Sequence, residues 1–218
     1  LHRQLREQSN SIISLYIRVR INQPSQHSCA FCNQSKITGV HVRSDQEIVH
    51  EAIRTYLDAL DSNSLPEKRE VAFYGGSFTG LTVERQNNLF NAVRPWINSG
   101  HIDSIRVSTH SLLVDDLNIS FLKDNFVQVV ELGIQSTNND VLSAVGRPCE
   151  FATVKGAVKS IRKKELTLGL QLMPGLPKDD ESTFLQSVKD VISLRPDFVR
   201  IYPTLVIRNT TLFKMYNT

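Results

Sequence analysis

The sequence has few of the features that mark secreted, membrane-spanning or nucleic-acid-coating proteins. Its 218 residues include only three cysteines, an odd number that argues against a disulfide framework and favours a reducing compartment. No apolar run approaches the ~20 residues that a membrane-spanning helix requires. With 25 basic and 22 acidic residues the net charge is +3, which lacks the strong basic bias of proteins dedicated to coating nucleic acids. We therefore expect a cytoplasmic protein that has no membrane partner.

The remaining composition is that of a folded globular protein. Hydrophobic residues make up 40% of the chain and charged residues 22%, which excludes a disordered, collagen-like or coiled-coil chain. This length suits one domain of ordinary to large size, so we expect a single domain over residues 1–218. The chain starts at Leu1 rather than Met, and we expect it to be a fragment of a longer protein.

Short apolar, β-branched runs alternate with amphipathic stretches along the whole chain. This alternation predicts an α/β protein of about six β/α units, with a parallel sheet and helices outside it. The pattern alone leaves open a doubly wound sheet or a curved barrel, and a complete barrel of eight units usually needs ~250 residues. Pro95 lies late in the second predicted helix and predicts an early end for it. The predicted strands cover 11–20, 71–74, 104–108, 127–134, 168–173 and 198–202, and the predicted helices cover 45–60, 82–97, 115–124, 138–146, 152–164 and 181–194.

Polar or glycine-rich segments follow the ends of nearly all the predicted strands. In either architecture, the carboxyl ends of parallel strands form the edge at which ligands bind. This arrangement is typical of a binding site for a polar small molecule. The segments are 27–34, 75–80, 108–110, 135–136, 171–173 and 202–204.

A pair of cysteines, Cys29 and Cys32, lies in the first of these segments. Two thiolates at this spacing can bind a metal or a cluster, form a redox pair, or lie buried as ordinary core residues. A structural zinc site needs four ligands, and His27 and Cys149 could contribute, but their spacing fits no familiar zinc pattern. The glycines at 75–76 are equally ambiguous. They allow either the close approach of a ligand or a tight turn, and they match neither the P-loop nor the G-x-G-x-x-G motif.

Five segments of the chain are more informative in their order and spacing than any of them is alone: 29–39 (CAFCNQSKITG), 73–80 (FYGGSFTG), 131–136 (ELGIQS), 169–177 (GLQLMPGLP) and 197–204 (DFVRIYPT). Together they resemble the radical S-adenosylmethionine (SAM) superfamily, in the branch around the catalytic subunit of Elongator and oxygen-independent coproporphyrinogen oxidase. The resemblance implies a partial (β/α)6 TIM-like barrel that holds a [4Fe–4S] cluster and SAM. It also implies that the reduced cluster cleaves SAM to a 5′-deoxyadenosyl radical, which abstracts a hydrogen atom from the substrate.

The resemblance also assigns individual residues. In this family three cysteines in a C-x3-C-x2-C pattern hold the cluster, and Cys29 and Cys32 match the second and third of them. The implied partners are SAM, an electron donor such as flavodoxin or ferredoxin, and a substrate that is tRNA or a small molecule such as a tetrapyrrole. The other assigned residues match positions that bind SAM: Phe31 beside the adenine, Gly75, Gly76 and Ser77 at the methionyl amine, and Ser108, Gln135 and Gln171 along the ribose and methionyl region.

Two positions depart from the family pattern. Ser25 stands where the first cluster cysteine belongs, and a serine hydroxyl is a poor iron ligand beside a thiolate because it is harder and much less acidic. Segment 108–112 reads STHSL where this branch has Ser-Thr-Arg-Pro-Asp. These departures leave three hypotheses: a radical SAM enzyme, a non-catalytic barrel of the same family that binds SAM or a partner, and a zinc-binding C-x-x-C protein.

Other conspicuous residues have structural interpretations. Glu131 and Arg200 lie in predicted strands, and we expect them to form an ion pair inside the barrel rather than to contact the substrate. We expect Trp96 to pack on an outer helix and Cys149 to be a structural residue.

Overall fold

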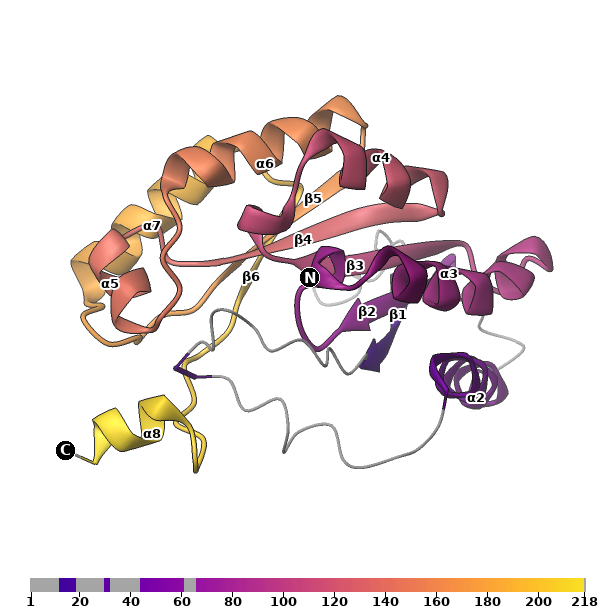
Figure 1. The fold of residues 1–218 in the computed structure, drawn as a ribbon, viewed down its shortest axis with the longest axis horizontal. Helices are drawn as coiled ribbons and strands as arrows, with labels where there is room; N and C mark the ends of the chain where they lie inside the picture. Colours follow the sequence, from indigo (N-terminus) through magenta and orange to yellow (C-terminus); the bar gives the residue numbers. More distant parts are fainter. Residues whose placement is uncertain (1–11, 19–29, 32–43, 61–65, 218) are drawn as a thin grey trace, which may run out of the picture.

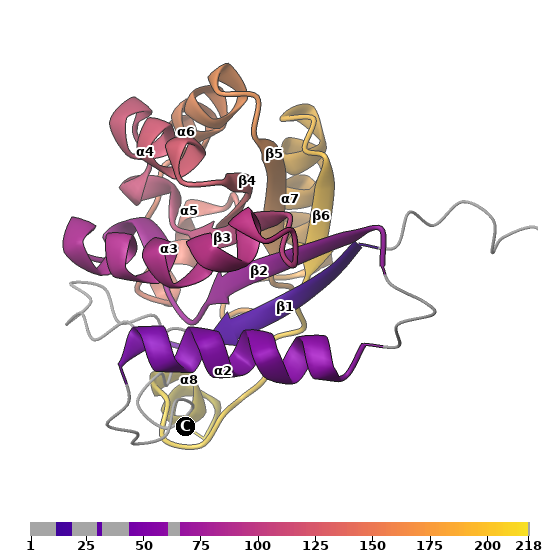
Figure 2. The same cartoon turned by 90° about the vertical axis from the view of Figure 1, so that its right-hand side faces the viewer.

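The computed structural model describes residues 12–18, 30–31, 44–60 and 66–217. In these residues, six parallel strands form one sheet, and their order in space is their order in the sequence (Figure 1). The sheet is curled, with helices on its outer side, which confirms the predicted partial (β/α)6 barrel (Figure 2). The strands are β1 (Ile12–Arg18), β2 (Lys68–Tyr74), β3 (Ser104–Thr109), β4 (Val127–Gln135), β5 (Thr167–Leu172) and β6 (Phe198–Ile201). The helices are α2 (Asp45–Asp58), α3 (Val83–Asn98), α4 (Asp116–Asp124), α5 (Asn139–Ala144), α6 (Phe151–Lys163), α7 (Glu181–Ser193) and α8 (Thr211–Tyr216), with short 3-10 helices η2 (Phe78–Gly80) and η3 (Ser111–Leu113).

The main hydrophobic core lies between the outer face of the sheet and the helices. Alternate residues of the strands point outward and are apolar, such as Phe73, Val107 and Leu132, which are all buried. The helices contribute apolar stripes at helical spacing, such as Leu89 and Val93 of α3. This packing holds the strands in place and leaves their other face toward the interior of the barrel.

Local signals in the sequence explain where two of the helices begin and end. Ser44 and Glu47 form a capping box at the start of α2, as the sequence predicts. The expectation that Pro95 ends α3 early is wrong, because the helix continues to Asn98. Pro95 and Asn91, whose carbonyl group loses its intrahelical donor, are both exposed, so water can satisfy that oxygen.

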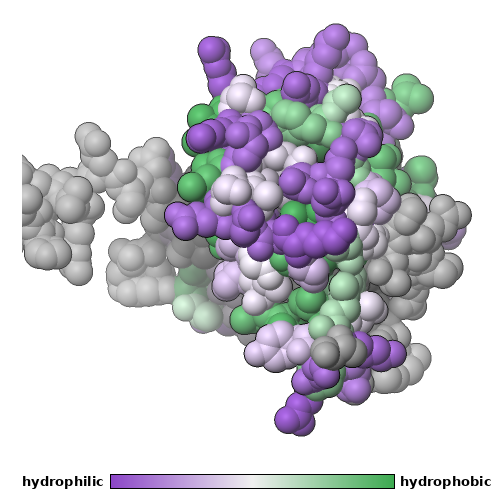
Figure 3. Space-filling model, turned by 90° about the vertical axis from the view of Figure 1, so that its left-hand side faces the viewer, coloured by the Kyte–Doolittle hydropathy of each residue, from purple (hydrophilic) through white to green (hydrophobic). Residues whose placement is uncertain are grey.

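The outer surface over α5 and α7 is chemically mixed. Figure 3 shows hydrophilic side chains interspersed with hydrophobic ones on this face. Leu185 and Ile192 of α7 are among the exposed apolar residues. None of the helices that the structure describes combines the length and the apolar character needed to cross a lipid bilayer.

The inner face of the sheet is polar, and its register sets which polar residues meet. Gly133 of β4 pairs with Gln171 of β5, and Gln171 pairs in turn with Arg200 of β6. A shift of register between Gly133 and Gln135 marks a bulge at the end of β4. Because residues two apart in a strand share a face, Glu131 points into the barrel together with Gly133.

Candidate functional site

Two groups of polar residues lie inside the barrel. The first, the mouth layer, lies near the carboxyl ends of the strands and consists of Ser108, Gly133, Gln135, Arg147 and Gln171. The second, the floor network, extends from residues deeper in the strands to Tyr74 at the end of β2, and consists of Ser14, Glu70, Tyr74, Ser104, Arg106, Glu131 and Arg200.

The mouth layer surrounds a space above Gly133. Three polar atoms lie near the point that a Cβ atom on residue 133 would occupy: Nε2 of Gln135 at 3.0 Å, Nη2 of Arg147 at 3.2 Å and Oε1 of Gln171 at 3.6 Å. Arg147 is held there because its Nη2 donates a hydrogen bond of 2.7 Å to the carbonyl oxygen of Gly133. A Cβ atom at residue 133 would be tight against Gln135 and Arg147 and in ordinary contact with Gln171, so glycine at this position keeps the space open.

Gln135 combines an unusual backbone conformation with an unsatisfied oxygen. Its φ is +72°, in the left-handed region that residues other than glycine rarely adopt, at the bulge that ends β4. The residue is 8% exposed, and its Oε1 accepts no hydrogen bond from any described residue. A buried acceptor without a partner costs about 1–3 kcal/mol. This oxygen is therefore well placed to accept a hydrogen bond from a ligand.

Gln171 connects the mouth layer to the floor network. Its Nε2 donates a hydrogen bond of 2.8 Å to Oε2 of Glu131 and lies 3.5 Å from the hydroxyl oxygen of Ser108. Its Oε1 lies on the side of Gly133. The structure thus brings together three of the residues that the sequence assigns to a ligand, namely Ser108, Gln135 and Gln171.

The glycine-rich loop 75–77 forms a separate part of the same edge. Its two glycines have φ values of +111° and +151°, which side chains disfavour. Immediately after the loop, Phe78 is buried in the core, and the hydroxyl groups of Thr79 and Thr109 hydrogen-bond to each other at the end of β3. These two anchors fix the half-buried backbone of the predicted residues 75–77, although their contacts are distinct from those of the mouth layer.

Ala30 and Phe31, the two residues between the predicted cluster cysteines, dock near the start of α8. The N–H of Ala30 donates a hydrogen bond of 2.9 Å to the carbonyl oxygen of Val145, and its carbonyl oxygen accepts one of 2.8 Å from the N–H of Leu212. Phe31 packs, together with Met173 from the end of β5, against the buried cluster that contains Ala30 and Val145. The predicted adenine-side residue Phe31 therefore lies beside the end of a barrel strand.

The predicted metal ligands lie outside the described residues, namely Cys29, Cys32, Ser25 and His27. Within the described ranges, no group of three or more His, Cys, Asp and Glu side chains could hold a metal ion. Cys149 is half-buried and packs against the hydrophobic core, and burial raises the pKa of its thiol. These contacts agree with a structural interpretation of Cys149.

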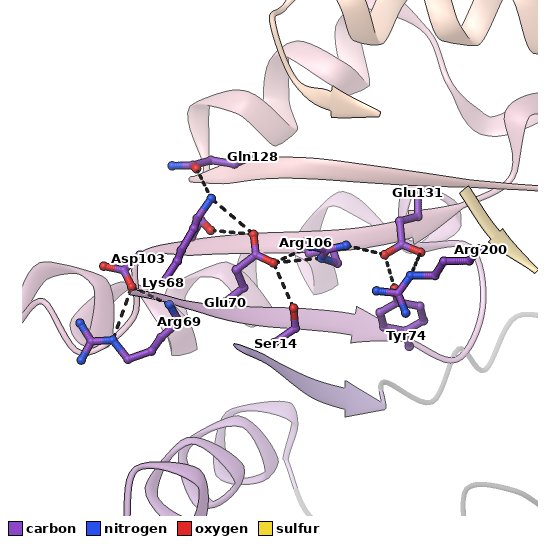
Figure 4. A network of polar contacts seen from close by, with 11 residues as sticks. Ser14, Lys68, Arg69, Glu70, Tyr74, Asp103, Arg106, Gln128, Glu131 and Arg200 are labelled. Carbon is purple, nitrogen blue, oxygen red and sulfur yellow. Dashed lines mark hydrogen bonds and ion pairs between the residues drawn. The ribbon is translucent and has the colours of Figure 1, made fainter. Parts of the chain in front are cut away.

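Figure 4 shows Glu131 joined to Tyr74, Arg106 and Arg200 in the floor network. Glu131 is 0% exposed, and side chains from four other strands contact its two carboxylate oxygens. Oε1 accepts hydrogen bonds from the hydroxyl of Tyr74 and, at 2.8 Å, from Nη1 of Arg106. Oε2 accepts the hydrogen bond from Gln171 and lies 3.2 Å from Nε of Arg200. The predicted ion pair between Glu131 and Arg200 is confirmed.

Arg106 links Glu131 to a second buried carboxylate, Glu70. Its Nη2 and Nε donate hydrogen bonds of 2.7 and 3.1 Å to Oε2 of Glu70, and the hydroxyl of Ser14 donates another of 3.1 Å. Burial alone would raise the pKa of Glu70. The hydrogen bonds and positive charge of Arg106, together with smaller contributions from other neighbours, outweigh burial and lower this pKa. Burial, the hydrogen bond to Glu131 and the negative charge of that residue raise the pKa of Tyr74, so its hydroxyl stays protonated.

Gly169 makes room for an aromatic ring in the floor network. A Cβ atom on residue 169 would overlap with the ring of Phe198. The guanidinium carbons of Arg106 and Arg200 lie 5.1 and 5.8 Å from the centroid of that ring, within the range of cation–π contact. The ring therefore fills the interior and contacts the cations of the floor network.

Several members of these two layers were not predicted from the sequence. Arg106 alternates with the apolar residues beside it in β3, and this alternation is the available signal for a sheet with one polar face. Glu70 and Tyr74 lie in β2, whose sequence KREVAFY shows no such alternation. Arg147 follows a helix rather than a strand, and only the fold brings it to Gly133. No pattern in the sequence marks that contact.

Comparisons with known proteins identify the family of the chain. The sequence profile of the Radical SAM superfamily matches residues 26–191. Over 129 residues, which are 59% of this chain and 28% of the relative, the chain is 29% identical to the anaerobic coproporphyrinogen III oxidase 1 of Cereibacter sphaeroides. Over 90 residues, which are 40% of this chain and 17% of the relative, it is 32% identical to the tRNA uridine(34) acetyltransferase of Methanocaldococcus jannaschii.

The fold is similar to that of a solved protein, Elp3 of Methanocaldococcus infernus. The TM-score is 0.72 at 18% identity, and the match covers 95% of this chain and 49% of that one. At this level of identity the likeness concerns the fold. The chain spans less than two thirds of the length of each of the three proteins.

Proposed function

Because the chain belongs to the radical SAM superfamily, we propose that it is a radical SAM enzyme domain. In this proposal the mouth layer binds SAM, and Cys29 and Cys32 are ligands of a [4Fe–4S] cluster. When bound, the cluster would supply the one-electron reduction that the cleavage of SAM and the abstraction of a substrate hydrogen atom require. The residues of this chain bind and orient SAM and keep water from the reaction.

The observation that carries this proposal is the pattern of donors and acceptors above Gly133. Gln135 offers a buried oxygen that has no donor among the described residues, and Gln171 offers a second amide oxygen. Arg147 adds a guanidinium group beside them. Amide oxygens accept hydrogen bonds from the ribose hydroxyls or the ammonium group of SAM, and a guanidinium group binds a carboxylate. This combination of groups fits the ribose and amino-acid parts of SAM.

The floor network supports the same proposal because it fills the barrel below the mouth layer. Glu70 and Glu131 are both 0% exposed and are bridged by Arg106. A filled interior keeps water from reaching a bound ligand through the bottom of the barrel. A reactive radical would therefore meet the substrate rather than solvent.

A second candidate function is the binding of SAM without its cleavage. Ser25 favours this candidate, because a serine hydroxyl is a poor replacement for the first cluster cysteine. The described contacts of Gln135, Arg147 and Gln171 include those with Gly133 and Glu131. In this candidate the three side chains bind SAM without a complete cluster site. Only the first candidate needs an electron donor, for which a flavodoxin or a ferredoxin is suitable.

The names of the relatives indicate two classes of substrate. One relative is named for coproporphyrinogen III and another for uridine 34 of tRNA. We therefore propose a substrate that is either a small molecule such as a tetrapyrrole or a tRNA.

The test is the iron and sulfide content after anaerobic reconstitution, measured with electron paramagnetic resonance and a SAM titration. It compares the unchanged chain with Ser25→Cys, and a Cys29→Ser, Cys32→Ser double variant is the control without cluster ligands. We expect Ser25→Cys to hold about four irons per chain and to cleave SAM on reduction. About four irons in the unchanged chain would support the enzyme, whereas SAM binding without iron would support the second candidate. Zinc in place of iron, or no SAM binding by either chain, would contradict both.

A further inference from the structure

We propose that Glu131 is a positioning residue that fixes the direction of the Gln171 side-chain amide, so that Gln171 presents its carbonyl oxygen to SAM. The inference rests on the proposed function, because it concerns how the mouth layer receives SAM. In this proposal Glu131 does not contact SAM and acts on SAM binding through Gln171 alone.

The contacts of Gln171 direct the two ends of its amide toward different neighbours. The nitrogen end faces Glu131, to which Nε2 donates a hydrogen bond of 2.8 Å. The oxygen end faces the space above Gly133, where Oε1 lies 3.6 Å from the point that a Cβ atom would occupy. The side chain thus spans the distance between the floor network and the mouth layer.

The chemistry of a carboxylate decides which end of the amide faces it. A glutamine amide that turns over about its last torsion exchanges a donor for an acceptor with almost no change of shape. An ionised carboxylate has no proton to donate, so beside Glu131 only the nitrogen end of Gln171 makes a hydrogen bond. The reversed amide would place two acceptor oxygens against each other in a buried site.

Glu131 can select this orientation because its own carboxylate is held by other residues. Arg106 and Arg200 place two positive charges beside it, at 2.8 and 3.2 Å, and the hydroxyl of Tyr74 donates a further hydrogen bond. These partners come from β2, β3 and β6, so the carboxylate is tied to strands on both sides of β4 (Figure 4). A ligand that enters the mouth layer meets an amide whose direction is already set.

The neighbours of Gln171 make this direction matter for the ligand. Nε2 of Gln135 and Nη2 of Arg147 already place two donor groups beside the space above Gly133. A reversed Gln171 would add a third donor, whereas the observed orientation adds an acceptor. The ribose hydroxyls and the ammonium group of SAM are donors, and they need such an acceptor.

Isosteric variants test this inference. Glu131→Gln keeps the shape of the side chain but replaces the carboxylate with an amide that both donates and accepts, so the direction of Gln171 is no longer selected. The matched control is Glu70→Gln, which changes the other buried carboxylate bound to Arg106 and has no hydrogen bond with Gln171. In a calorimetric titration of the anaerobically reconstituted chain with SAM, we expect Glu131→Gln to weaken binding roughly tenfold and Glu70→Gln less than about twofold.

The same substitution in a Gln171→Met background separates positioning from a general loss of structure. We expect Glu131→Gln to weaken SAM binding no further in that background, because the amide on which it acts is gone. Glu131→Asp is a second variant, which keeps the negative charge for the two arginines but withdraws the carboxylate from Gln171. We expect it to weaken SAM binding about as much as Glu131→Gln does.

A nuclear magnetic resonance signal reports the orientation without any ligand. The side-chain NH2 group of Gln171, assigned by its loss in Gln171→Met, is expected to give one sharp pair of proton signals at a single nitrogen shift in the unchanged chain and in Glu70→Gln. We expect these signals to shift or broaden in Glu131→Gln. Equal losses of SAM affinity in Glu131→Gln and Glu70→Gln would overturn this inference alone. So would a full effect of Glu131→Gln in the Gln171→Met background. No SAM binding by the unchanged chain would overturn the proposed function and this inference with it.

Discussion

The floor network and the mouth layer lie on neighbouring parts of the same strands, yet they differ in how their polar atoms are satisfied. In the floor network, the two buried carboxylates share Arg106, and further cations, hydroxyl groups and an amide also contact them. In the mouth layer, the buried Oε1 of Gln135 has no donor among the described residues, and its backbone has a φ of +72°. A network with its partners present stabilises the barrel, whereas a layer that lacks a partner is suited to a ligand.

Arg106 of the floor network and Arg147 of the mouth layer should show the largest difference between the layers. Arg106→Met leaves Glu70 and Glu131 buried without the cation that they share, and removing one partner of a buried ion pair costs about 3–5 kcal/mol of unfolding free energy. Arg147→Met removes a hydrogen bond to the carbonyl oxygen of Gly133 and leaves no buried carboxylate of the floor network without its shared cation, so we expect a smaller cost of about 1 kcal/mol. It should instead weaken SAM binding. Urea unfolding measures both variants, and equal losses would contradict the division into two layers.

The two inward glycines should show the next largest difference. Gly169→Ala forces the ring of Phe198 to move, and such overpacking costs about 1–3 kcal/mol. Gly133→Ala meets the ends of the flexible side chains of Gln135 and Arg147, so its loss of stability should be smaller, while the new methyl group should hinder SAM binding. Thermal unfolding and SAM titration compare the two.

The control for these substitutions is Gly156→Ala. Gly156 lies in α6 with no atom near its missing Cβ, so alanine should stabilise the chain by roughly 0.5–1 kcal/mol through its helix propensity. A stabilising effect of Gly169→Ala would mean that Phe198 does not occupy the space that the structure assigns to it.

The smallest expected effect is on the pH dependence of the unfolding free energy, and we expect it from a residue of the floor network, Glu70, and not from the mouth layer. The pKa of Glu70 is lower in the folded chain than in the unfolded one, where it is about 4.3. Its contribution to stability is therefore fully present above that unfolded value and is lost as the pH falls through the lower, folded value. We expect Glu70→Gln to flatten this part of the stability profile, and Gln135→Met, in the mouth layer, to leave it unchanged. Urea unfolding at several acidic pH values is the measurement, and an unchanged slope in Glu70→Gln would assign the loss to other carboxylates.

Much of the fold could be predicted from local patterns. Apolar runs such as 127–134 and 168–173 predict β4 and β5 nearly to the residue, because both strands are buried. The start of β2 was missed, since the strand begins at Lys68 rather than Val71. Glu70 faces the interior of the barrel, and a charged residue in that place does not look like part of a buried strand.

The candidate site could be predicted only in part, and the reason is again physical. Ser108, Gln135 and Gln171 lie near the carboxyl ends of strands, which is the edge of a parallel sheet where ligands bind. Arg147 follows α5 and reaches the site through the path of the chain, so its sequence context carries no such signal. The oxygen of Gln135 has no partner because of how neighbouring side chains pack, which a one-dimensional pattern does not contain.

The sequence by itself determined the alternation of strands and helices and membership of the family. These properties depend on hydrophobic periodicity and on short motifs, which are local in the chain. Only the tertiary structure decided that Glu131 meets Tyr74, Arg106, Gln171 and Arg200, and that Gln171 turns its oxygen toward Gly133. Partners that lie 25 to 57 residues apart in the chain, as Arg106, Gln171 and Tyr74 do from Glu131, come together only when the sheet curls and its inward side chains converge.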